Sequence, residues 1–96
     1  MIVVREVFIA KPGMASKLAT MFKAEMSKEM GKDVKVLTDM TGSFNKVVIE
    51  SEYENIAAFD REMQEYMKQA KPATDPSKPN YQEMYTHGKR EIFRVW

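Results

Sequence analysis

A chain of 96 residues that is 44% hydrophobic and 30% charged has the size and composition of one globular domain with a thin core. Its net charge of +1, with basic residues scattered among acidic ones, excludes the strongly basic surface typical of nucleic-acid or anionic-membrane binding. The sequence contains no cysteine, which excludes disulfides, thiolate nucleophiles and thiolate metal sites.

The sequence predicts neither a signal peptide nor a membrane-spanning segment. Its start, M-I-V-V-R-E, lacks the basic segment and long apolar run of a signal peptide. No apolar run approaches the roughly 20 residues of a membrane-spanning helix. We therefore expect one soluble domain over residues 1–96, cytoplasmic by default, with neither membrane nor nucleic acid among its partners.

The first predicted elements are a strand and a helix. Ile2–Ala10 is almost continuously β-branched, as central strands are, until Lys11–Gly13 interrupts it with proline and glycine. Met14–Met30 carries one apolar stripe at helical spacing, which predicts a helix. The stripe consists of Leu18, Met21, Phe22 and Met26.

Two further strands are predicted at Val34–Thr41 and Lys46–Tyr53, joined by a loop at Gly42–Asn45. Successive residues of a strand point to opposite faces. Alternation gives the second of these strands one wholly apolar face, Val47 and Ile49, which we expect to pack against the helices.

The remaining elements are a helix, a loop and a strand. An apolar stripe predicts a helix over Glu54–Ala70, and the proline-rich segment Lys71–Asn80 predicts a loop. The stripe consists of Ile56, Phe59, Met63, Tyr66, Met67 and Ala70. Tyr81–His87 is expected to form a helical turn before a final strand at Lys89–Trp96. We expect this strand to pair with the first one and to anchor the Trp96 ring in the sheet.

The order β-α-β-β-α-β predicts an α+β domain of the ferredoxin-like type. Both helices would cover one face of an antiparallel sheet, with the first and third strands in its centre. The strands also carry apolar side chains on the other face, so a monomer would expose an unusually large apolar patch. We expect a second copy of the chain to cover it.

Two stretches of the sequence resemble a known family. F-I-A-K-P-G-M-A-S-K-L, from Phe8 to Leu18, resembles the strand–K-P-G–helix opening common in the dimeric α+β barrel superfamily. Y-T-H-G-K-R-E-I-F-R-V-W, from Tyr85 to Trp96, resembles the closing strand of its NIPSNAP-like members, near G-R-R-E-I-Y-R-V-W. Small proteins similar to antibiotic-biosynthesis monooxygenases belong to the same superfamily.

This resemblance implies a homodimer whose two sheets close into a barrel with the helices outside. Members include cofactor-free monooxygenases of polyphenolic rings, haem-degrading enzymes, small-molecule isomerases and many proteins of unknown role. The haem-degrading relatives carry their ligand histidine on a helix, and neither predicted helix here contains one. We therefore expect no cofactor.

His87, the only histidine, is predicted to lie in the loop just before the last strand. There it can act as a general base or contact a ligand at the barrel mouth. The alternative is a loop histidine in water. One histidine and no cysteine exclude three-histidine and thiolate metal sites within one chain, so no metal site is expected.

Charged residues within the predicted strands form a second candidate site. Arg5 or Glu6, with Asp39, Glu50 and Arg94, can form a cluster that points into the barrel. In the functional interpretation, Arg5 and Arg94 orient a ligand and Glu50 or Asp39 acts as a base. In the alternative, these charges form cross-strand ion pairs that only stabilise the sheet or the dimer.

Tyr81, Tyr85 and Trp96 can line a pocket for a flat aromatic ligand, or pack between subunits and fill the end of the barrel. Three functions remain open. They are a homodimer that binds a small, largely apolar molecule, a cofactor-independent oxygenase or isomerase, and a structural or partner-binding dimer without ligand. A barrel interior below roughly 300 Å³ favours the last, and a titratable side chain inside the cavity favours the second.

Overall fold

Four strands form the sheet of this structure, a computed structural model that describes residues 1–30, 34–42, 44–69 and 81–96. The strands are β1 (Ile2–Ala10), β2 (Lys35–Thr38), β3 (Lys46–Tyr53) and β4 (Tyr85–Arg94). They lie in the order β2-β3-β1-β4, and each neighbouring pair is antiparallel. The first and third strands are central, and the first and last strands pair, as the sequence predicts.

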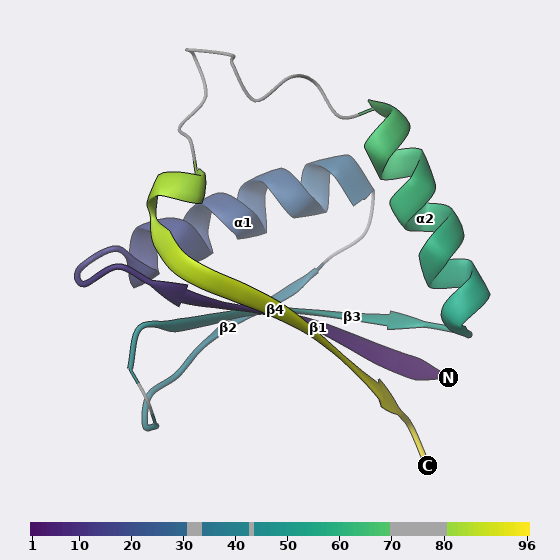
Figure 1. Cartoon of the computed structure of the whole chain (residues 1–96), viewed down its shortest axis with the longest axis horizontal. Helices are drawn as coiled ribbons and strands as arrows, with labels where there is room; N and C mark the ends of the chain where they lie inside the picture. The colour runs from purple at the N-terminus through teal and green to yellow at the C-terminus, as the bar shows by residue number, and fades with distance from the viewer. Residues whose placement is uncertain (31–33, 43, 70–80) are drawn as a thin grey trace.

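Both helices cover the same face of the sheet (Figure 1). They are α1 (Ala15–Met30) and α2 (Ile56–Gln69), and a short 3-10 helix, η1 (Tyr81–Glu83), precedes β4. This arrangement confirms the predicted α+β fold with the order β-α-β-β-α-β. The predicted loop at Lys71–Asn80 lies outside the described residues. Within the part of the chain that the structure describes, neither helix is long and apolar enough to span a membrane.

The denser half of the core lies under α1. Leu18 and Phe22 of this helix are 0% and 1% exposed. The Phe8 ring lies 4.9 Å from the Phe22 ring and 4.8 Å from the Tyr85 ring, measured between centroids. The remaining buried members of this cluster are Ala10, Val34, Val47 and Ile49. The apolar face predicted for the third strand therefore packs against the helices.

The smaller half of the core lies under α2. Its buried members are Ile2, Val4, Tyr53 and Phe59, with Met63 packed against them. The stripe predicted for this helix is only partly right, because Ile56 and Met67 are 61% and 68% exposed. Ile56 is the first residue of the helix. Figure 1 shows α2 rising away from the sheet toward its C-terminal end. Met67 belongs to the last turn of the helix, at that end.

The last strand differs from its predicted bounds at both ends. It begins at Tyr85, four residues before Lys89, and it ends at Arg94. One backbone bond continues the pairing, from the N–H of Val95 to the carbonyl of Met1. Trp96 lies beyond it with a fully exposed side chain, so the expectation that the sheet anchors its ring is wrong for the single chain.

A bulge near the start of β4 sets the direction of its first side chains. The register steps from Ile9 opposite His87 to Ala10 opposite Tyr85, which leaves Thr86 as the extra residue. The Thr86 hydroxyl donates to the Ile9 carbonyl at 3.2 Å. Because of the bulge, Tyr85 packs into the core under α1 although it lies two residues from His87.

The β2–β3 hairpin has a shorter first strand than predicted. Pairing ends at Thr38, and Asp39 Oδ1 accepts the backbone N–H of Lys46 at 3.1 Å across the hairpin mouth. Phe44 and Asn45, the last residues of the loop, have φ angles of 61° and 59°, in the left-handed region that residues other than glycine rarely adopt.

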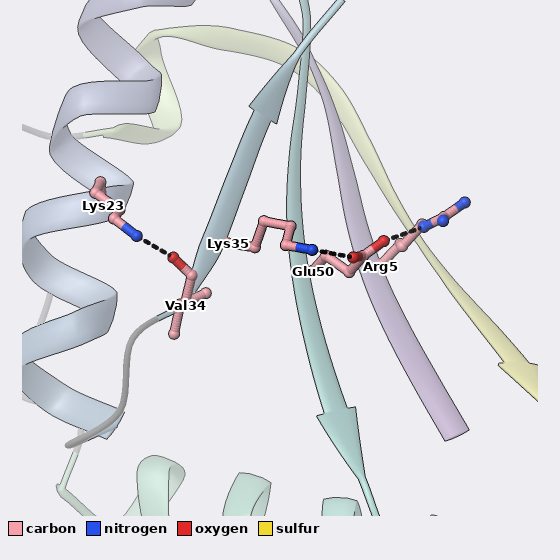
Figure 2. Close-up of polar contacts among 5 residues, drawn as sticks. All are labelled: Arg5, Lys23, Val34, Lys35 and Glu50. Carbon is pink, nitrogen blue, oxygen red and sulfur yellow. Dashed lines mark hydrogen bonds and ion pairs between the residues drawn. The ribbon is translucent and has the colours of Figure 1, made fainter. Parts of the chain in front are cut away.

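The start of β2 is tied to α1 by one side chain. Lys23 Nζ donates to the carbonyl of Val34 at 2.6 Å (Figure 2).

Candidate functional site

The face of the sheet without helices, which we call the open face, carries side chains in rows across the strands. The strands pair residue by residue, so alternation assigns each paired residue to one face. The first two rows are Val3, Glu52 and Phe93, then Arg5, Glu50, Glu91 and Lys35. The next two are Val7, Val48, Lys89 and Leu37, then Ile9, Lys46 and His87. Apolar and charged side chains thus share this face.

Glu50 is the centre of an ion-pair network on the open face (Figure 2). Arg5 Nε donates to Glu50 Oε1 at 2.8 Å, and Lys35 Nζ lies 3.6 Å from Oε2. The Glu50 side chain is only 15% exposed, whereas that of Arg5 is 45% exposed. The Arg5 guanidinium also lies 5.1 Å from the centroid of the Phe93 ring, so it carries a cation–π contact.

A hollow of about 330 Å³ lies at the other end of the open face. It is lined by Val7, Ile9, Lys46, His87, Gly88 and Lys89. Val7 and Ile9 of the central strand β1 form its apolar floor. Lys46 stands on the β3 side, and His87 and Lys89 stand on the β4 side. The lining therefore combines an apolar floor with three side chains that can carry positive charge.

A second ion pair lies on the opposite, helix-covered face. Arg90 Nε donates to Glu6 Oε1 at 2.5 Å, and the Arg90 guanidinium lies 5.1 Å from the centroid of the Phe59 ring. Glu6 and Arg90 are neighbours across β1 and β4. This pair sits beside the smaller core cluster and takes no part in the hollow.

Tyr53, near the same pair, has a clearly shifted pKa. Its side chain is 8% exposed. Burial raises the pKa of the Tyr53 phenol well above its usual range, and the hydrogen bond to Glu62 raises it further. The Tyr53 phenol therefore stays protonated at a pH where an exposed tyrosine ionises, and it acts as a hydrogen-bond donor under α2.

The predicted cluster of charges forms only in part, because some of its candidate members lie on different faces. Arg5 and Glu50 meet on the open face, whereas Glu6 lies on the covered face with Arg90. Asp39 lies at the hairpin mouth, where its Oδ2 is buried without a hydrogen-bond partner among the described residues.

The aromatic and C-terminal candidates are also dispersed. Arg94 is exposed opposite Ile2 at the end of β4, on the covered side by alternation. Tyr85 packs into the core and Trp96 lies free in solvent, so the two do not line a common pocket. No side-chain placement is described for Tyr81.

His87 lies in the strand, which corrects its predicted position in a loop. It is paired opposite Ile9 and points to the open face, where it lines the hollow. The strand begins earlier than predicted because the run Tyr85–Gly88 pairs with β1 despite its turn-like composition. Among the described residues, no group of three metal-binding side chains gathers closely enough to hold an ion.

Comparison with known proteins identifies the fold. No protein-family model matches the chain, and no curated protein matches its sequence. A NIPSNAP domain protein from Burkholderia xenovorans superposes with a TM-score of 0.77 at 14% identity, over 100% of this chain and 95% of that one. The chain has the NIPSNAP-domain fold.

Two further NIPSNAP structures are also similar to this chain in fold. A NIPSNAP-like domain protein from Burkholderia xenovorans has a TM-score of 0.69 at 19% identity, covering 99% of this chain and 84% of that one. A NIPSNAP family protein from Agrobacterium tumefaciens has a TM-score of 0.67 at 12% identity, covering 97% and 90%. The resemblance seen in the sequence is thus confirmed for the fold. Function does not follow from it, since one fold hosts many functions.

Lys46 and Lys89 line the hollow but were not singled out from the sequence. Each stands at the margin of a predicted strand, where a lysine ordinarily reaches into solvent. The signal that could have found them is the register of the strands. Once β1 is paired with β3 and β4, both lysines flank the apolar residues Val7 and Ile9.

Proposed function

We propose that this chain forms a homodimer through its open face and binds a small, largely apolar molecule in the barrel so formed. The observation that carries the proposal is the hollow, which has an apolar floor on a face that no helix covers. Its volume of about 330 Å³ lies within the range of about 300–1,000 Å³ typical of small-molecule sites.

Charge on the open face favours a second copy as the partner. Its basic residues are Arg5, Lys35, Lys46 and Lys89, and its acidic residues are Glu50, Glu52 and Glu91. In a two-fold interface the same face of both subunits meets, so a strongly charged face would repel its copy. This face is nearly balanced, and a copy would also cover Leu37 and Phe93, which are 40% and 43% exposed.

Sedimentation velocity between about 1 and 100 µM tests the dimer. We expect a species of twice the chain mass of 11.1 kDa. Leu37→Glu places a carboxylate on the open face and should yield a folded monomer, because burying it without a partner is costly. Met67→Glu makes the same change on the exposed side of α2 and should leave the dimer intact. A folded wild-type monomer throughout this range would contradict the proposal.

The uncharged fluorophore N-phenyl-1-naphthylamine tests the ligand site. Its emission should rise in the presence of the wild-type protein, saturate, and fall again when an unlabelled naphthalene competes. The monomeric Leu37→Glu variant should give little enhancement, because its hollow remains open to water. Equal enhancement by wild type and this variant would place the bound probe elsewhere and contradict a site within the barrel.

A cofactor-independent oxygenase or isomerase is the second candidate, favoured by the position of His87. The imidazole lines the hollow, where it can accept a proton from a bound molecule. Oxygen uptake with naphthalene-1,4-diol, above its uncatalysed autoxidation, tests the oxygenase. His87→Gln should abolish the uptake and retain probe binding. A His87→Gln protein with undiminished uptake would exclude the imidazole as the base.

The third candidate, a dimer without a ligand, makes the opposite prediction. Such a dimer would sediment as described above and bind no probe. Probe binding by the wild-type dimer, lost in the Leu37→Glu monomer, therefore separates the ligand-binding dimer from a structural one.

A further inference from the structure

We infer that the hollow takes an organic anion, an apolar ring or short chain that carries a carboxylate or phenolate. This inference rests on the proposed function and adds the charge of the ligand to it. The feature behind it is the one-sided charge of the lining. Lys46, His87 and Lys89 surround the apolar floor, and no acidic side chain lines the hollow among the residues that the structure describes.

The register places these three groups around one spot. Lys46 and His87 flank Ile9 from the two strands beside β1, and Lys89 flanks Val7 one row away. Neighbouring strands lie about 4.8 Å apart, so the backbones of Lys46 and His87 are separated by about 10 Å. Flexible side chains on both sides of this gap can converge on one anionic group above the floor.

Carboxylates elsewhere on the open face compensate these cations only weakly. Lys89 Nζ lies 3.9 Å from Glu91 Oε2, and both side chains are well exposed, at 66% and 40%. A pair of this kind contributes little. Glu50, in contrast, is already held by Arg5 and Lys35.

The positive charge of Lys46 is compensated by carboxylates even less than that of Lys89. No ion pair to its ammonium group is found within the described residues. The nearby Asp39 uses Oδ1 to accept the backbone N–H of Lys46 rather than to pair with its side chain.

When the open face is covered, the lysine side chains around the hollow need a negative charge nearby more than they do in water. Enclosing an unpaired ammonium group next to an apolar floor costs free energy, because water is removed from the charge. An anion held between Lys46 and Lys89 offsets that cost, and its apolar body covers Val7 and Ile9. A neutral ligand of the same shape offers only the apolar contact.

A matched pair of ligands tests the inference, naphthalene-2-carboxylate against naphthalene-2-carboxamide, each titrated calorimetrically into the wild-type dimer. We expect the carboxylate to bind at least about tenfold more tightly at low salt, which corresponds to about 1.4 kcal/mol. The preference should shrink at 0.5 M salt, since ions screen charges that remain accessible to solvent.

Lysine variants locate the effect. Lys46→Met and Lys89→Met should each reduce the preference for the carboxylate several-fold, and together they should remove it. Lys35→Met is the matched control, because Lys35 lies on the same face, is 66% exposed and does not line the hollow. It should leave the preference unchanged.

The outcomes separate this inference from the function on which it rests. If the carboxamide binds as tightly as the carboxylate, the apolar site stands and the anion inference is wrong. If Lys46→Met weakens the dimer but leaves the preference intact, the lysine serves the interface and the inference is again wrong. If neither naphthalene binds and the neutral fluorophore also fails to bind, the proposed function itself is overturned.

Discussion

Arg5 and Glu6 are neighbours in β1, yet their ion pairs belong to two different environments. Arg5 pairs with Glu50 on the open face, and Glu6 pairs with Arg90 on the face that the helices cover. Each arginine also lies 5.1 Å from the centroid of an aromatic ring, Phe93 on one face and Phe59 on the other. The same arrangement, an arginine paired with a glutamate and placed over an aromatic ring, is therefore present twice, once beside a core and once beside solvent.

The difference between the faces lies in what surrounds each motif. On the covered face, the ion pair lies beside the buried residues of the smaller core cluster. On the open face, Phe93 and Leu37 are among the exposed large apolar residues. If a second subunit covers the open face, both motifs become interior ones. Variants on the covered face should then change the stability of the subunit, while variants on the open face should change assembly.

Phe22→Ala on the covered face should have the largest effect. The Phe22 side chain is 1% exposed and packs against the Phe8 ring. Its removal leaves a cavity, and we expect a loss of about 3–5 kcal/mol in the free energy of unfolding, measured by urea denaturation.

Phe93→Ala on the open face is the matched comparison. We expect it to cost less than Phe22→Ala at low protein concentration, and its cost should grow with concentration because assembly adds to the stability of the wild type. Equal, concentration-independent losses for the two variants would mean that the faces do not differ in the way described.

Much of the fold could be predicted because each element carries a strong local pattern. β3 was predicted with its observed bounds, Lys46–Tyr53, and the apolar pair Val47 and Ile49 faces the helices. The central position of β1 follows from its β-branched composition. Such patterns depend only on neighbouring residues, so they can be read from one sequence.

The candidate site could be predicted only in part, because it depends on the register of the strands and on one β-bulge. The bulge at Thr86 separates Tyr85 from His87, placing the first in the core and the second in the hollow. Sequence alternation alone assigns both to one face. The pairing of Arg5 with Glu50 depends on contacts between residues 45 positions apart, which composition does not reveal.

Gly88→Ala should cause the next largest loss of stability, because the added methyl group would press on a residue of the covered face. A Cβ atom at this position would lie 3.0 Å from Phe8 Cδ1 and 3.1 Å from Cε1, which is tighter than most packed contacts, so the Phe8 ring would have to move by a few tenths of an ångström. The Phe8 ring is held by the rings of Phe22 and Tyr85 and has little room to move. We expect a loss of about 1–3 kcal/mol in the free energy of unfolding.

A double-mutant cycle with Phe8→Leu identifies the cause of that loss. Leucine is smaller than the ring, so the double variant should lose less stability than the sum of the two single variants. Strict additivity in urea denaturation would show that Gly88 is needed for a reason other than the space taken by Phe8.

Tyr53→Phe tests the covered face through pH. The pKa of Tyr53 is raised in the folded chain, so above about pH 10 the unfolded chain releases the phenol proton while the folded chain retains it. This contribution is fully present below pH 10 and is lost as the pH rises further. Its slope approaches about 1.4 kcal/mol per pH unit.

The Tyr53→Phe protein should therefore lose stability less steeply than the wild type between pH 10 and 11.5. Urea midpoints measured across this interval give the two slopes, and the lysines, common to both proteins, cancel in their difference. Parallel curves would mean that the phenol is not protected from solvent under α2.

Glu50→Gln, compared with Glu6→Gln, is the smallest and sharpest test of the two faces. Each variant neutralises the acid of one ion pair while keeping its shape. Arg5 and Arg90 are 45% and 43% exposed in the single chain, so each variant should change the stability of the subunit by no more than about 1 kcal/mol. Stability alone therefore does not distinguish the two variants, but assembly does.

In a dimer formed through the open face, Glu50→Gln leaves the Arg5 and Lys35 charges in the interface without the carboxylate that pairs with them. This should raise the dimer dissociation constant at least about tenfold, or about 1.4 kcal/mol. Glu6→Gln lies on the opposite face and should leave that constant unchanged. Sedimentation equilibrium of both variants decides between the faces, and a reversed result would place the subunit contact on the helix-covered side.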